Sequence, residues 1–162
     1  MKSLFRFFFK VFNRVIRIPR YEMDWVRLND MLKQKETVAN IVLWDGRYKY
    51  TDFETMLKII KYDIVKWHQY RLEEYDCDNF AMTFAGLVPF MYGVNNVGIA
   101  IGRVVDLNTG NIGYHAWNVF LVQKSNGKPE LYMYEPQTGQ FTTYRNGRIG
   151  NLRYEPVYII WG

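Results

Sequence analysis

Residues 76–93 read DCDNFAMTFAGLVPFMYG, and this stretch decides the expected fold. Asp76 is a favourable N-cap residue, and the apolar run after it predicts a buried helix that ends between Pro89 and Gly93. Residues 97–161 have a different texture, because short apolar and β-branched segments alternate there with glycine-containing turns. We therefore expect a central helix packed on an antiparallel sheet.

The residues before the central helix have helical patterns. Residues 24–35 predict a short helix, and a capping box formed by Thr51 and Glu54 predicts a second helix that continues to about Tyr70. Helices followed by a meander of strands define an α+β fold with segregated layers.

Composition excludes several classes of protein. The chain has 162 residues, which suits one domain, and its single cysteine excludes an internal disulfide framework and a cysteine-rich zinc site. Aromatic residues make up 18% of the chain, which favours a sheet-rich core. The sequence contains no phosphate-binding loop, dinucleotide fingerprint or zinc-ligand spacing.

Residues 1–20 differ in charge from the rest of the chain. They contain six basic and no acidic side chains, whereas residues 21–162 are close to neutral, so no specific nucleic-acid partner is expected. We interpret residues 1–20 as a basic amphipathic leader helix and residues 21–162 as a single domain. The leader is expected to pack on its own domain or on a second subunit of a homodimer, with contact to a membrane surface or an acidic partner as alternatives. No apolar run suits a signal peptide or a membrane span, which favours a cytoplasmic location.

Three side chains suggest a reactive site. Cys77 follows the N-cap, where the helix dipole favours a thiolate. His115 lies within the long predicted strand at residues 112–123, and Glu135 ends the next predicted strand. A cysteine, a histidine and a carboxylate in this order form a nucleophile, base and orienter set, in which the thiolate would attack a carbonyl carbon.

Other residues compete for these roles. Asn118 is an alternative orienter, but strand alternation places it on the opposite face from His115, so Glu135 is preferred. A small core residue remains the alternative interpretation of Cys77.

The segments at Asp76–Ala81, His115–Asn118 and Tyr134–Gln137 resemble the papain-like cysteine protease fold. The similarity is closest to the protease domain at the C-terminus of certain fungal agglutinins and to bacterial and phage transglutaminase-like cysteine proteinases. The resemblance implies that Cys77 is the nucleophile, His115 the base and Glu135 the third member. It also implies an oxyanion-hole glutamine, for which Gln69 and Gln137 are the candidates.

Calcium is a further implication of the resemblance. Asp76 and Asp78 flank the thiol and should raise its pKa, and a bound cation would cancel that effect. Together with Asn79 they offer the hard oxygen ligands that calcium prefers, although helix capping is the simpler explanation.

The leading hypothesis is a hydrolase, a papain-like cysteine peptidase or amidase that cleaves a peptide-type bond in a peptide or protein substrate. The alternatives are a catalytically silent papain-like binding or structural module, and a transglutaminase or cell-wall amidase that uses the same triad. Small size and the basic leader fit an accessory protein of a phage or bacterium by analogy.

Overall fold

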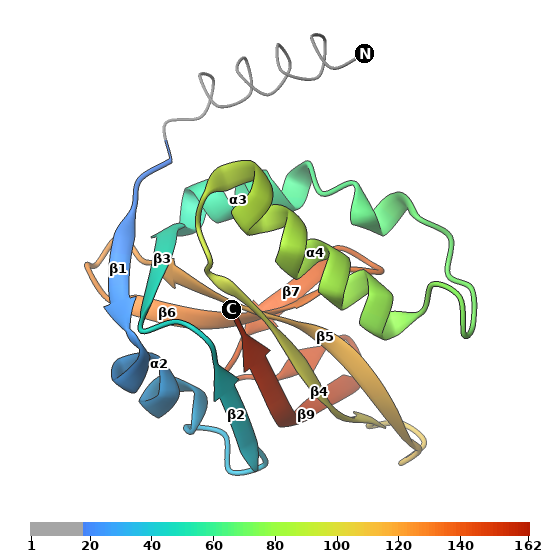
Figure 1. Ribbon diagram of the computed structural model, residues 1–162. Coiled ribbons are helices and arrows are strands. Elements are labelled where there is room, and N and C mark those ends of the chain that lie inside the picture. The colour runs from blue at the N-terminus through green and yellow to red at the C-terminus, as the bar shows by residue number, and fades with distance from the viewer. Residues whose placement is uncertain (1–17) are drawn as a thin grey trace, which may run out of the picture.

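The computed structural model describes residues 18–162, and residues 1–17 of the expected leader lie outside the described residues. Strands outweigh helices in the described part (Figure 1). None of its helices is long and apolar enough to cross a bilayer. The elements run in the order β1 (Tyr21–Asp24), α2 (Trp25–Leu32), β2 (Asn40–Leu43), β3 (Arg47–Asp52), α3 (Phe53–Lys61), η1 (Val65–Trp67), α4 (Cys77–Tyr92), β4 (Val97–Asp106), β5 (Ile112–Gln123), β6 (Pro129–Glu135), β7 (Gln140–Thr143), β8 (Arg148–Ile149) and β9 (Leu152–Trp161).

Within residues 18–162 the strands form one nine-stranded sheet. Its main path is β1-β3-β5-β4-β9-β2, and β6 pairs with both β5 and β7 while β8 pairs with β9. The pairs β2–β9 and β3–β5 are parallel, whereas the other pairs are antiparallel. The expected purely antiparallel sheet is therefore wrong, because early strands insert beside late ones.

The predicted α+β, papain-like arrangement with N-terminal helices is also wrong, since three strands precede α4. The missed signal is clearest in β3, whose sequence RYKYTD alternates between polar and aromatic residues. Tyr48 and Tyr50 are buried while Arg47 and Lys49 are exposed, which is the period-two pattern of a half-buried strand. Strands this short are stabilised by pairing with strands that are distant in the sequence. The helical patterns of the local sequence therefore hid the strands before α4.

The sheet has a hydrophobic core on each face. Helices α3 and α4 lie on one face and α2 on the other (Figure 1). Strand β5 serves both cores by alternation: Trp117 and Val119 belong to the α2 side, and Phe120 and Val122 to the α4 side. The two faces of β5 therefore have different surroundings over residues 117–122.

Helix α4 confirms the expected central helix. The backbone N–H of Asp76 donates to the side-chain oxygen of Asn79 at 3.2 Å, which fixes the first turn. Gly93 ends the helix with φ of 67°, a left-handed conformation that glycine adopts at little cost. Cys77 is thus held at the first helical position.

Helix α3 differs from its predicted extent. Asp52 rather than Thr51 is the N-cap, and its carboxylate accepts from the N–H of Thr55 at 2.7 Å. The helix ends at Lys61 instead of Tyr70, because the side chain of Asp63 accepts from the N–H of Val65 and redirects the chain into η1.

Candidate functional site

Glu135 is a buried carboxylate, 4% exposed, at the end of β6. One of its oxygens lies 2.6 Å from Nε2 of His115 and accepts from the hydroxyl of Tyr154 at 3.2 Å. The other oxygen accepts from the backbone N–H of Gln137 at 3.2 Å. Burial and the adjacent Glu135 raise the pKa of Tyr154 well above its usual range, so this hydroxyl stays protonated and donates. These contacts offset the cost of burying the carboxylate and fix the His115 ring.

An open pocket of about 510 Å³ adjoins this cluster. Its walls come from the ends of β4, β5 and β9 and from the turn after β6. Tyr114 stands at the rim with 82% of its surface exposed. The lining residues are Val104, Asp106, Asn111, Ile112, Gly113, Tyr114, His115, Glu135, Gln137, Thr138, Leu152 and Tyr154.

Sequence reasoning weighed His115, Glu135 and Gln137 but missed most of this pocket. No sequence pattern singles out Tyr114 or Tyr154, which line the pocket together with Asp106. The pocket joins segments near residues 104–115, 135–138 and 152–154, which no local pattern connects. The one available signal was an aromatic residue beside His115, at the exposed end of a long strand.

Cys77 lies beside the same strand but does not line the pocket. Its half-buried thiol accepts a hydrogen bond from the backbone N–H of Ala116, the residue after His115. Burial raises the pKa of the thiol above its ordinary value, and the charges of Asp76 and Asp78 raise it further. The expected effect of the two carboxylates is confirmed, and the expected thiolate is not favoured.

The predicted triad is only partly connected. His115 and Glu135 are in direct contact, whereas the part of the chain that the structure describes contains no hydrogen bond between Cys77 and His115. The thiol reaches the backbone of β5, while the His115 side chain turns toward Glu135. The described residues therefore contain no continuous chain of hydrogen bonds from the thiol to the carboxylate.

The other candidates differ in their positions relative to His115. Asn118 is fully buried on the α4 face, where its Nδ2 donates to the carbonyls of Ala81 at 2.8 Å and Gly98 at 3.2 Å. Gln69 is exposed in the loop before α4. Gln137 lines the pocket, and its buried Nε2 has no hydrogen-bond partner among the described residues.

The side chains predicted to bind calcium make hydrogen bonds within the first turn of α4, and a calcium site there stays a prediction. The oxygen of Asn79 accepts from the N–H of Asp76, and the carboxylate of Asp78 accepts from the N–H of Asn79 at 2.9 Å. A hydrogen bond between the carboxyls of Asp76 and Asp78 raises the pKa of Asp76. No group of three or more His, Cys, Asp or Glu side chains in residues 18–162 is placed to hold a metal ion. These oxygens serve to cap α4.

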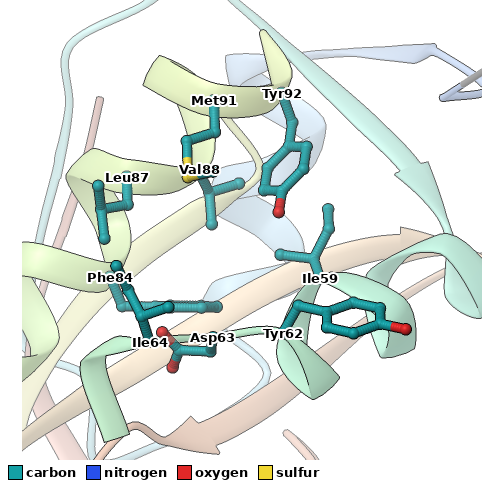
Figure 2. A pocket seen from close by; sticks show the side chains of 9 residues that line it. All are labelled: Ile59, Tyr62, Asp63, Ile64, Phe84, Leu87, Val88, Met91 and Tyr92. Carbon is teal, nitrogen blue, oxygen red and sulfur yellow. The ribbon is translucent and has the colours of Figure 1, made fainter. Parts of the chain in front are cut away.

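A second, smaller pocket of about 40 Å³ lies between α3 and α4 (Figure 2). Asp63 is the charged residue among its mostly apolar walls, and its oxygens accept from the N–H of Val65 at 2.8 Å and the hydroxyl of Tyr134 at 2.6 Å. Burial raises the pKa of Asp63 above its ordinary value. This pocket is a gap in the core and lacks the polar lining of the larger one.

Comparison with protein families decides the family. The model of the ricin-type beta-trefoil lectin C-terminal domain matches residues 28–152, which is more than half of the chain. The chain belongs to this family. A comparison with curated proteins gives no match.

Two solved structures share the fold of this lectin-family chain. The "PSL1a-E64 complex" matches with a TM-score of 0.65 and 20% identity, over 86% of this chain and 51% of that one. Polyporus squamosus lectin, bound to the human-type influenza-binding epitope Neu5Aca2-6Galb1-4GlcNAc, matches with a TM-score of 0.62 and 19% identity, over 86% and 49%. The chain thus spans about half the length of these proteins.

These matches correct the family expected from the sequence. The papain-like cysteine protease assignment is wrong, because the lectin model and the lectin structures account for the chain instead. The predicted hydrolase activity, as peptidase or amidase, depended on that assignment and falls with it. The same correction applies to the transglutaminase, cell-wall amidase and silent papain-like alternatives, and to the phage or bacterial accessory role.

Proposed function

We propose that this chain is a carbohydrate-binding module and that the open pocket beside His115 and Glu135 holds the sugar. The observation that carries the proposal is the lining of a pocket of about 510 Å³, which combines exposed aromatic surface with several polar side chains. Pockets of this size suit small organic ligands. The lectin family supports a saccharide among such ligands.

A sugar ring needs two kinds of contact, and the pocket offers both. The ring's apolar C–H groups pack against flat aromatic faces, and the exposed Tyr114 supplies one at the rim. Sugar hydroxyls both donate and accept hydrogen bonds, which suits Asp106, Asn111 and Thr138 in the wall. The carboxylate of Asp106 is held in place because it accepts from the N–H of Asn108 at 2.8 Å.

The predicted site residues take new roles in this proposal. His115 contacts the sugar, and the nearly buried Glu135 positions the His115 ring instead of meeting the ligand. Gln137 lines the pocket, and its buried Nε2 has no hydrogen-bond partner among the described residues. A bound ligand, or a small movement of the side chain, would give this donor an acceptor. Cys77 packs α4 against β5 and takes no part in binding.

A glycan array followed by calorimetry with the best ligand tests the proposal. Tyr114→Ala should weaken binding by about fivefold, since an aromatic contact contributes roughly 1 kcal/mol and 1.4 kcal/mol is tenfold. Tyr158→Ala is the matched control, because Tyr158 is an exposed tyrosine on β9 that does not line the pocket. Absence of binding to every glycan, or equal weakening by both substitutions, would contradict the proposal.

A further inference from the structure

An apolar surface surrounds the smaller pocket between α3 and α4. Its walls join Tyr62 and Ile64, just after α3, with Leu87 and Met91 on α4 (Figure 2). Tyr62 is 58% exposed and Ile64 is 56% exposed, although both side chains are large and mostly apolar. We call the surface formed by these four residues the α3–α4 groove. Exposed apolar surface that borders a gap favours an occupant that removes it from water.

The groove suits an apolar occupant better than a cation. The charged lining residue is Asp63, and one of its oxygens accepts from the N–H of Val65 at 2.8 Å while the other accepts from the hydroxyl of Tyr134 at 2.6 Å. Both oxygens therefore have donors within the fold. The gap of about 40 Å³ can accept the end of one apolar side chain.

The described part of the chain starts beside this groove. Ile18 packs against the core cluster that contains Ile59 and Tyr92, and both of these residues line the pocket. The guanidinium of Arg20 donates to the carbonyl oxygen of Tyr92 at 3.5 Å. Residues 1–17, which lie outside the described residues, are thus joined to the domain next to a wall of the groove.

Residues 1–17 have the chemistry of an apolar occupant. In a helix of this sequence, one face would carry an apolar stripe made of Phe5, Phe8, Phe9, Phe12 and Ile16. A helix of this length extends about 25 Å, which is as far as the 16 residues of α4 extend. The segment is therefore long enough to lie along the groove.

A tethered segment has an advantage over a separate partner. A short connection at Ile18 keeps the segment at a local concentration on the order of 1 mM, which a second copy in solution would have to match. Charge does not draw the basic segment to the groove, because Lys58 and Lys61 are exposed on the adjacent helix α3. Binding would therefore depend on apolar burial, with the basic side chains turned to water.

We infer that residues 1–17 bind the α3–α4 groove of their own chain through the phenylalanine stripe. The contact covers Tyr62 and Ile64, the most exposed of the four groove residues, and buries the stripe at the same time. The pocket beside His115 is lined by other residues and stays open. Binding of the segment is therefore independent of the proposed glycan binding.

Trypsin digestion of the full chain tests the inference, because a docked segment is cleaved only when it is released. Cleavage after Arg14 should be at least about tenfold slower in the wild-type chain than in Phe9→Asp, which puts a charge into the apolar stripe. Tyr62→Asp should speed cleavage similarly from the groove side, and the exposed position of Tyr62 lets the domain keep its fold. Ser3→Asp is the matched control, since it adds the same charge on the basic face and should leave the protection intact.

Methyl NMR of the same variants locates the contact. The Met91 methyl resonance should shift between the wild-type chain and Phe9→Asp and stay in place in Ser3→Asp. The protection against trypsin should also be independent of chain concentration, because the segment binds its own chain.

Four results would overturn the inference. Protection that grows with chain concentration would assign the segment to a second copy, and protection that appears only with anionic lipid vesicles would assign it to a membrane surface. Equal cleavage of the wild-type chain and Phe9→Asp would mean that the stripe is not bound. Full protection in Tyr62→Asp, with no shift of the Met91 methyl resonance in Phe9→Asp, would place the segment outside the groove.

Discussion

Two side chains three residues apart on β5 have opposite surroundings. Asn118 faces α4, is fully buried, and donates to two backbone carbonyls. His115 faces the other side, contacts Glu135, and borders a pocket open to solvent. The comparison teaches that one strand packs against a helix on one face and forms part of an open pocket on the other. Substitutions on the two faces should therefore affect different measurements.

The largest expected effect is a loss of stability after a side chain is added at Gly102 in β4. Gly102 pairs with His115 across the β4–β5 ladder, and a Cβ at Gly102 would collide with the backbone of Glu155 on β9. Gly102→Ala should lower the free energy of unfolding by about 3 kcal/mol or more, because backbone atoms must shift. Urea unfolding of the wild-type chain and the variant measures this difference in the free energy of unfolding.

Gly113→Ala is the matched control, since Gly113 lies on the neighbouring strand in open space. Its effect on stability should stay within about 0.5 kcal/mol. Similar losses for the two substitutions would mean that the β4–β9 packing described here is incorrect.

Asn118→Ala should produce the next largest effect. It removes two buried hydrogen bonds and leaves a small cavity between α4 and the sheet, so the free energy of unfolding should fall by about 2–4 kcal/mol. Asn111→Ala, in the exposed turn at the start of β5, should cost less than about 0.5 kcal/mol. Thermal or urea unfolding compares them, and a tolerated Asn118→Ala would break the contrast between the two faces.

Asp63 should give a smaller, pH-dependent effect on the α4 side. Burial raises its folded pKa above the ordinary 3.8, so the folded chain holds this proton more tightly than the unfolded chain. The resulting stabilisation is fully present below about pH 3.8 and is lost as pH rises through the folded value.

Urea unfolding at several pH values between 4 and 7 tests the sign. The difference in stability between the wild-type chain and Asp63→Asn should move against the wild type as pH rises, because only the wild type ionises a buried carboxyl. A difference that stays constant, or moves the other way, would show that Asp63 is not desolvated.

The smallest expected change is at Cys77. Alkylation of the single thiol should have a pH midpoint above the ordinary value of about 8.5, because burial raises its pKa. Asp78→Asn should lower that midpoint by removing one nearby negative charge. A midpoint well below 8.5 would contradict this description and return the thiolate to consideration.

The sequence predicted much of the later half of the fold. Strand β5 was expected at residues 112–123 and occurs there, and α4 begins at Cys77 as expected. Alternation also placed His115 and Asn118 on different faces correctly. These features depend on local period and capping, which a sequence displays directly.

The rest depended on contacts that are distant in the sequence. The parallel insertion of β2 beside β9 and of β3 beside β5 leaves no local signature. The pocket joins Asp106, Tyr114 and Tyr154 from three strands, so its existence follows only from the sheet order. The leader at residues 1–17 lies outside the described residues, and its homodimer and membrane contacts stay predictions, as does the cytoplasmic location.

The most direct test of the central claim is a ¹H–¹⁵N NMR titration of the full chain with Galβ1-4GlcNAc. The account predicts saturable shifts at backbone amides around the pocket, in residues 111–115 and 137–138, while amides of α3 and α4 stay in place. Absence of shifts, or shifts centred on Cys77 and the start of α4, would contradict a sugar site beside His115 and Glu135.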